Sequence, residues 1–203
     1  MNELSRFTGF KRGNAPLRAL GAGFSWVAMG LAGCATTPTE PVTDRLDPDT
    51  ATTVTILSRP IELVAASLQQ GARSSVYDPF AYMAPFETDK MGARDLYLWV
   101  STPQTRGDQK PPQVLCNGQT LTLQPLSDAP KVDLSQLSLS REPYDAPVPW
   151  SVQWYFKLSE DGLKCLTEAS SVTVDADALD GTPAEFTTSE RKTLASLDAF
   201  ARR

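Results

Sequence analysis

The fold class of this chain is decided by the stretch Trp150-Ser151-Val152-Gln153-Trp154-Tyr155-Phe156-Lys157-Leu158. Apolar residues recur at every second position along it. Successive side chains of a β-strand point to opposite faces of the sheet, so the alternation predicts a strand with one buried face and one solvated face. The buried face is expected to carry Trp150, Val152, Trp154, Phe156 and Leu158. The solvated face is expected to carry Ser151, Gln153, Tyr155 and Lys157.

Further runs of strand-forming residues lie on both sides of this stretch. Residues 96–100 are apolar throughout, which indicates a central strand that is covered on both faces. Residues 114–116 and 119–123 flank Asn117-Gly118, a dipeptide that favours a tight hairpin turn because both turn residues need positive φ. Three more strands are predicted at 54–57, 61–65 and 171–175.

Two segments have the spacing of apolar residues that is typical of helices. Ser159 is a suitable N-cap for a short helix over 159–169, with Leu163 and Leu166 facing inward. A second helix is predicted near the C-terminus at 189–202, and its apolar face consists of Leu194, Leu197, Phe200 and Ala201. Many short strands and two helices predict a mainly β fold, a single antiparallel β-sandwich-like domain over residues 54–203.

Two segments lack a regular period. Residues 125–149 contain five prolines and are expected to be mainly a connection, with one turn of helix near Leu134, Leu137 and Leu139. Residues 78–86 contain two prolines, which predicts an ordered loop or a short edge segment. Aromatic rings on such a loop offer stacking area for an apolar or glycan ligand. The candidate ligand-binding residues are Tyr77, Phe80, Tyr82 and Phe86, and the alternative is that these rings pack onto the core.

The N-terminal segment has the layout of a secretory signal. Residues 1–18 carry four basic residues and one acid, and residues 19–33 carry no charge. An uncharged run of this length is shorter than the roughly 20 residues of a membrane-spanning helix. The run ends in Leu31-Ala32-Gly33-Cys34, which resembles the lipobox of bacterial lipoproteins at all four positions.

The resemblance implies cleavage before Cys34, acylation of the Cys34 sulfur and a third acyl chain on the new amine. Residues 1–33 would be a signal peptide, and the acyl chains would make the membrane contact. Three chains hold a protein lastingly, whereas one holds it reversibly. Lipoproteins retained in the inner membrane carry Asp at the next position, so Ala35 implies the outer membrane, with the protein on its periplasmic side. The alternatives are an ordinary signal peptide with a chance cysteine and an uncleaved anchor.

The segment after the lipobox has the composition of a tether. Residues 34–53 are rich in threonine and proline and poor in apolar residues, so they cannot bury enough surface to offset the entropy of ordering them. We therefore expect a lipidated, flexible tether over 34–53. Residues 46–50 and 53–55 are also similar to the start of some uncharacterised proteobacterial lipoproteins, a resemblance that implies no function.

The charge of the chain excludes one class of partner. The formal charge is 19 − 24 = −5 for the whole chain, and residues 1–33 contribute 4 − 1 = +3, which leaves −8 for the remainder. An acidic protein repels the phosphates of nucleic acids, so no nucleic-acid partner is expected.

Histidine and cysteine usage narrows the chemistry further. The chain has no histidine, which removes Ser-His-Asp and Cys-His catalysis in their usual forms and the zinc and iron sites that depend on His ligands. With Cys34 acylated, only Cys116 and Cys165 remain, and in an oxidising compartment two such residues are expected to form a disulfide. The alternative is a pair of buried free thiols.

No motif in the chain points to a reaction. Phosphate-binding loops, dinucleotide-binding turns and nucleophile elbows are absent from the sequence. Residues 175–181 place their third acid and their glycine one position too late for a helix-loop-helix calcium site. We therefore expect no catalytic residue, metal or cofactor, and a non-catalytic scaffold, assembly or accessory factor of the envelope that binds a partner protein. The alternatives are a module that binds a small apolar or glycan ligand and an unrecognised envelope hydrolase.

Overall fold

The computed structural model describes residues 40–69, 80–103, 110–127, 132–177, 182–188 and 191–203, without the side chains of 191–193. All of these residues belong to one unit that spans 38–203. Its strands are β1 (Val42–Asp47), β2 (Thr52–Leu57), β3 (Ile61–Ala65), β4 (Phe80–Lys90), β5 (Ala93–Pro103), β6 (Gln113–Cys116), β7 (Gln119–Thr120), β8 (Gln124–Pro125), β9 (Ser151–Lys157), β10 (Val172–Asp177) and β11 (Pro183–Thr188). Its helices are α1 (Ala66–Gln69), α2 (Glu160–Glu168), α3 (Arg191–Ala201) and the 3₁₀ helix η1 (Leu134–Leu137).

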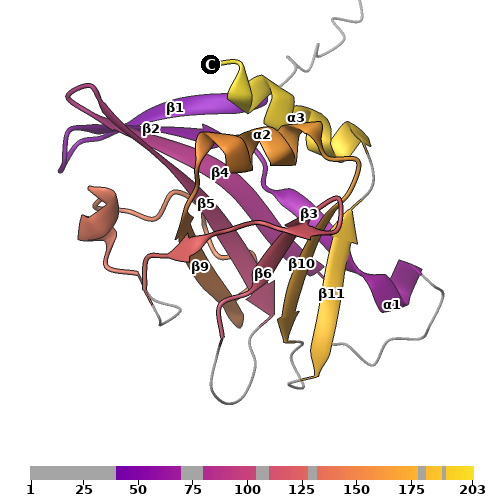
Figure 1. The fold of residues 1–203 in the computed structure, drawn as a ribbon. Helices are drawn as coiled ribbons and strands as arrows, with labels where there is room; N and C mark the ends of the chain where they lie inside the picture. The colour runs from indigo at the N-terminus through magenta and orange to yellow at the C-terminus, as the bar shows by residue number, and fades with distance from the viewer. Residues whose placement is uncertain (1–39, 70–79, 104–109, 128–131, 178–181, 189–190) are drawn as a thin grey trace, which may run out of the picture. The chain divides into compact units, whose positions relative to one another are not determined.

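The strands form one antiparallel sheet, which confirms the predicted mainly β class (Figure 1). The strand order is β7-β6-β10-β11-β3-β4-β5-β9-β8, and the β1–β2 hairpin joins the sheet through β4. The two ends of this order, β7 and β8, are separated in the chain by residues 121–123 alone. Such a short link requires the sheet to curl back on itself. The two layers of a sandwich are therefore supplied here by a single curled sheet.

Several predicted elements appear where local patterns placed them. Strand β3 covers the predicted 61–65, β6 includes the predicted 114–116, and β2, β5, β9 and β10 include the strands predicted at 54–57, 96–100, 150–158 and 171–175 apart from their terminal residues. The strand predicted over 119–123 is too long, because β7 ends at Thr120. The turn between β6 and β7 has φ values of 51° at Asn117 and 78° at Gly118, as a tight hairpin turn requires. The connection between β8 and β9 contains η1 at the predicted place. Strand β11, which pairs with β10, was not predicted.

Residues 80–86 of the segment predicted as an ordered loop or short edge segment over 78–86 instead belong to the long strand β4, so the prediction is wrong for them, and residues 78 and 79 lie outside the described residues. Strand β4 pairs with β5 along one edge, and its other edge pairs first with β3 and then with β2. Pro85 lies between the last residue paired with β3 and the first paired with β2. A proline cannot donate to a sheet ladder, and here the ladder changes partner strand at that residue.

The hydroxyl of the buried Tyr144 links β2 to β4 beside Pro85. The Leu57 N–H donates to Tyr144 Oη at 2.9 Å, and the Tyr144 hydroxyl donates to the Pro85 carbonyl at 2.8 Å. The Tyr144 side chain therefore takes the place of a ladder hydrogen bond between β2 and β4. Burial raises the pKa of Tyr144, so the hydroxyl stays protonated and can donate.

The predicted tether is also wrong in its second half, because β1 occupies 42–47 within it. The Asp47 carboxylate, 5% exposed, accepts hydrogen bonds from Ser140 N and Ser140 Oγ, both at 2.7 Å, and from the N–H groups of Asp49 and Thr50. These bonds, led by the one from Ser140 N–H, lower the pKa of Asp47 to about 2. Ser140 lies 93 residues away in the chain, so the composition around Asp47 could not predict these hydrogen bonds.

Strand β9 has the predicted alternation but a different division into faces. Val152, Trp154 and Phe156 are buried as expected, whereas Trp150 precedes the strand and is 45% exposed. Tyr155 was expected on the solvated face and is buried, because the connection before β9 covers that face. Glu142 of this connection accepts a hydrogen bond from Gln153 Nε2 at 2.9 Å. Both faces of the sheet are therefore covered at the centre of β9.

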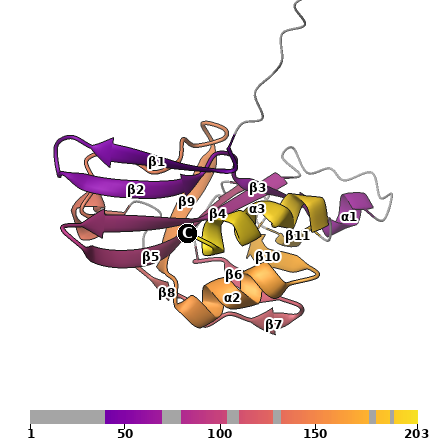
Figure 2. The same cartoon turned by 90° about the horizontal axis from the view of Figure 1, so that it is seen from above.

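The two longer helices lie side by side across one end of the curled sheet (Figures 1 and 2). Helix α2 begins after Ser159, whose hydroxyl accepts from Gly162 N–H at 3.0 Å, so the predicted N-cap is confirmed. Leu166 is fully buried and Leu163 partly. In α3, the predicted apolar face is confirmed for Leu194, Leu197 and Phe200. Ala201 is exposed, contrary to the prediction.

Candidate functional site

Two of the candidate residues lie outside the described part of the chain. Cys34 and Tyr77 belong to segments whose structure is not described, so acylation of Cys34 stays a prediction. Among the described residues, no helix has the length and apolar character needed to cross a membrane.

The predicted disulfide between Cys116 and Cys165 is present. The Cα atoms of the two residues are 6.2 Å apart, within the range that a disulfide bridges. Cys116 ends β6 immediately before the Asn117-Gly118 turn, and Cys165 lies in α2. The bridge therefore attaches the β6–β7 hairpin to α2. Asn117 supports the same attachment, since its side-chain oxygen accepts from Ser170 N–H at 2.9 Å just after the helix.

The three described aromatic candidates, Phe80, Tyr82 and Phe86, do not form one exposed ligand surface. Phe86 is fully buried, and its ring stacks on Tyr97 with centroids 5.1 Å apart. Phe80 and Tyr82 are partly exposed on the same strand, and both have partners within the chain. The ligand-binding hypothesis required exposed rings, whereas the alternative, in which the rings pack onto the core, is confirmed for Phe86. A central strand instead buries part of them between the sheet and the elements that cover it.

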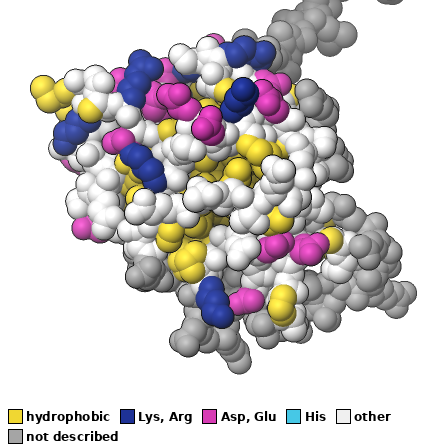
Figure 3. All heavy atoms as spheres, in the orientation of Figure 1, with side chains coloured by type: hydrophobic (Ala, Val, Ile, Leu, Met, Phe, Trp, Pro, Cys, Tyr) yellow, Lys and Arg dark blue, Asp and Glu magenta, His cyan; other side chains and the backbone are white. Residues whose placement is uncertain are grey.

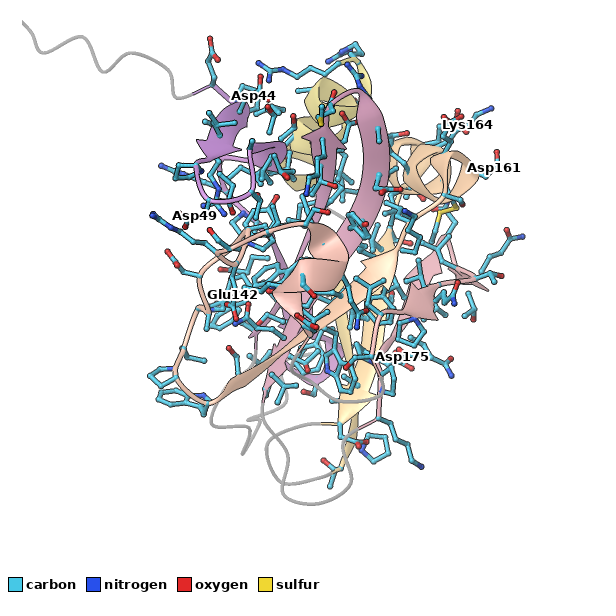
Figure 4. The ribbon with its side chains drawn as sticks, turned by 90° about the vertical axis from the view of Figure 1, so that its left-hand side faces the viewer. Asp44, Asp49, Glu142, Asp161, Lys164 and Asp175 are labelled. Carbon is cyan, nitrogen blue, oxygen red and sulfur yellow. A yellow bond between two sulfur atoms is a disulfide. The ribbon has the colours of Figure 1, made fainter. Side chains whose placement is uncertain are left out.

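A large groove lies where the helices leave part of the sheet uncovered, and we call it the acidic groove. Its volume is about 810 Å³, and it lies between α2, the end of α3 and the strands β1, β2, β4 and β5. Its charged lining residues are Asp44, Glu87, Arg94, Asp95, Glu160, Asp161, Lys164 and Arg203. Its other lining residues include Thr55, Leu96, Leu163 and Phe200. Figure 4 shows Asp44 on β1 at one side of this region and Asp161 and Lys164 on α2 at the other.

Strand register explains why these residues share one face. Asp44 is paired with Thr55, Thr55 with Glu87, and Glu87 with Leu96, so one row of side chains crosses four strands. Residues directly opposite each other in antiparallel strands point to the same face. Thr55 Oγ1 donates to Asp44 Oδ1 at 2.8 Å within this row. The row therefore forms the floor of the acidic groove.

The charges of the groove are unequal, with three cations against five carboxylates, 3 − 5 = −2. Each lining cation already has a carboxylate partner within the chain. Arg203 contacts Asp44 at 2.7 Å, Arg94 contacts Asp89 at 3.3 Å and Glu87 at 3.7 Å, and Lys164 contacts Glu168 at 4.0 Å. Asp95 pairs with Lys157, which does not line the groove. Glu160 and Asp161 have no cationic partner among the described residues.

A second, smaller groove of about 410 Å³ lies over β10 and β11. Asp175 and Glu185 are directly opposite each other there, and Lys110 and Gln113 line the same groove. Burial, together with the charge of Glu185, raises the pKa of Asp175. Within the described ranges, no group of three His, Cys, Asp or Glu side chains is arranged to hold a metal ion.

Sequence reasoning missed the acidic groove because its residues are spread from 44 to 203 along the chain. The local signal that could have been read is the pair Glu160-Asp161, two acids in the first turn of a predicted helix. Acids there favour the helix by opposing its dipole, so the pair alone does not indicate binding. In comparisons with known proteins, no family model, no curated protein and no solved structure matches the chain.

Proposed function

We propose that the protein is a lipid-anchored component of the bacterial envelope that binds a partner protein without catalysing a reaction. The lipobox at Leu31–Cys34 supports the anchor, with Cys34 as the acylated residue. The disulfide between Cys116 and Cys165 supports an oxidising compartment such as the periplasm. Ala35 supports the outer membrane as the destination, with the domain on its periplasmic side.

The observation that carries the binding role is the acidic groove. Sites for small molecules are mostly apolar and enclose much of their ligand. The groove instead has eight charged residues in its lining and crosses four strands, which suits the surface of another protein better than a small apolar ligand. A non-catalytic scaffold or accessory factor needs a surface that binds its partner, and it needs no reactive side chains.

The revised domain boundary changes how the anchor would work. Between Cys34 and β1 lie residues 35–41, so seven residues replace the longer tether expected from composition. A fully extended chain covers at most about 3.6 Å per residue, which limits the distance from Cys34 to Val42 to about 29 Å. The domain would therefore be kept close to the membrane surface, and its partner would have to be another envelope component within that reach.

Two measurements in cells test this proposal. Labelled palmitate should enter the wild-type protein and should not enter Cys34→Ser, while Cys116→Ala/Cys165→Ala should still be labelled. Photo-crosslinking groups placed around the acidic groove should trap a reproducible envelope protein, and groups placed at Glu62, an exposed position on β3, should not. Failure of labelling refutes the anchor. Absence of any specific crosslink across the groove refutes the binding role.

A further inference from the structure

The shape and charge of the acidic groove specify what its partner must present. Its two boundary walls are α2 on one side and β1 with the end of α3 on the other. Neighbouring strands lie about 4.8 Å apart, so the row from Asp44 to Leu96 spans three such intervals, about 14 Å. An extended chain advances about 3.3 Å per residue, so a segment of four or five residues fits this span.

The carboxylates without partners are on the α2 side. Glu160 and Asp161 line the groove and have no cationic partner within the described residues, whereas the three lining cations contact other carboxylates: Arg203 contacts Asp44, Arg94 contacts Glu87 and Asp89, and Lys164 contacts Glu168 at 4.0 Å. A ligand that enters the groove therefore meets a surplus of negative charge. Figure 3 shows Asp and Glu side chains gathered, together with Lys and Arg, along the upper part of this face.

Apolar surface adjoins these charges. Leu96 and Leu163 are partly exposed in the groove lining. Leu46 lies on β1 two residues after Asp44, so it is on the same face, and it is 65% exposed. Lys and Arg side chains combine long apolar stems with a charged end, which allows them to cover such apolar surface while the charge meets a carboxylate.

From these features we infer that the acidic groove binds an extended, cationic segment of a partner protein, with Lys or Arg side chains placed against Glu160 and Asp161. This inference rests on the proposed role in protein binding and names the chemistry of the partner. A small polycation carries the same charge but has no apolar side chains for Leu46, Leu96 and Leu163. A nucleic acid or an anionic segment is repelled by the same surplus charge.

The test measures binding of defined peptides to the purified full chain. The probe is a fluorescent Arg-Leu-Arg-Leu-Arg peptide, compared with Glu-Leu-Glu-Leu-Glu, and the readout is fluorescence anisotropy. The arginine peptide should bind, the glutamate peptide should not, and the affinity should fall as salt rises because ions screen exposed charges. The variant Glu160→Gln/Asp161→Asn should weaken binding of the arginine peptide by about tenfold or more, the factor that corresponds to about 1.4 kcal/mol.

The matched control removes two negative charges elsewhere. Glu62→Gln/Glu185→Gln changes the net charge by the same amount at two exposed positions that do not line the groove, and it should bind within about twofold of the wild type. A second groove variant, Thr167→Lys, adds a cation to the lining and should also weaken binding. It keeps the inference falsifiable if the first variant fails to fold.

The outcomes separate the inference from the proposed function. Equal losses in the groove variant and the control would show a net-charge effect and overturn the inference. Complete displacement of the peptide by spermine at equal charge concentration would overturn the assignment to a protein segment. Specific crosslinks in cells without binding of the arginine peptide would overturn the cationic segment and leave the proposed function standing. Peptide binding without any crosslinked envelope protein would refute the proposed function instead.

Discussion

Removal of the Cys116–Cys165 disulfide should cost the domain a large part of its stability. The bridge closes a sequence separation of 49 residues. The chain-entropy model, with an entropy change of about −2.1 − 1.5R ln n cal/mol/K, gives about 4 kcal/mol at 25 °C for a loop of this length. A domain of this size loses about 2–4 °C in Tm per kcal/mol, so Cys116→Ala/Cys165→Ala should melt about 8–16 °C lower than the wild type.

The sulfur atoms themselves contribute through packing, and the assay separates this contribution from the crosslink. Cys116 is almost fully buried, so its replacement by alanine also leaves a small cavity. Urea unfolding followed by tryptophan fluorescence should be compared for the oxidised wild type, the reduced wild type and the double variant. The step from oxidised to reduced protein measures the crosslink, and the step from reduced protein to the variant measures the sulfur packing.

Two results would refute this reasoning. The first is labelling of both thiols in protein taken from the periplasm without reductant, since it would show that the bridge is absent. The second is a difference below about 1 kcal/mol between the oxidised and reduced wild type, because the entropy model requires about four times as much. In the reduced protein, amide exchange should rise first in α2, since the bridge attaches this helix to the β6–β7 hairpin.

Two further perturbations test the buried polar contacts of the fold. Tyr144→Phe removes the hydroxyl that links Leu57 N–H to the Pro85 carbonyl, so two buried groups lose their hydrogen-bond partner. The free energy of unfolding, measured by urea unfolding, should fall by about 2 kcal/mol. An unchanged value would mean that water or a backbone shift replaces the hydroxyl. Asp47→Asn tests the lowered pKa of Asp47, which is about 2 in the folded protein against an ordinary value of 3.8. Such a carboxylate contributes stability that is fully present above pH 3.8 and is lost as the pH falls toward 2. Wild-type stability should therefore decline between pH 4 and pH 2, as followed by Tm, and the variant should show a shallower decline; parallel curves would contradict the assignment.

The sequence by itself determined the elements whose causes lie within a few residues. Alternation over 151–157 predicts β9, Asn117-Gly118 predicts the hairpin turn, and Ser159 predicts the start of α2. The disulfide was predictable for a different reason. Two cysteines remain once Cys34 is assigned to acylation, so their pairing needed no knowledge of their positions in space.

The tertiary structure alone decided which segments join the sheet. Residues 42–47 have the composition of a tether, yet Asp47 is anchored by Ser140 from a distant part of the chain. Residues 80–86 have the composition of a loop, yet the Tyr144 hydroxyl fills the gap beside Pro85 and allows β4 to continue. In both cases long-range hydrogen bonds outweigh the local preference for a tether or a loop, and the composition of the segment cannot predict such bonds.

The acidic groove shows the same limit most clearly. Asp44, Glu87 and Leu96 share one face because the register of three strand pairs aligns them, and a slip of one residue would send each to the opposite face. Glu160 and Asp161 join them because α2 packs beside this part of the sheet. The sequence determines how many charges the protein carries, and the packing of strands and helices decides which of them gather on one surface, since that depends on contacts between residues far apart in the chain.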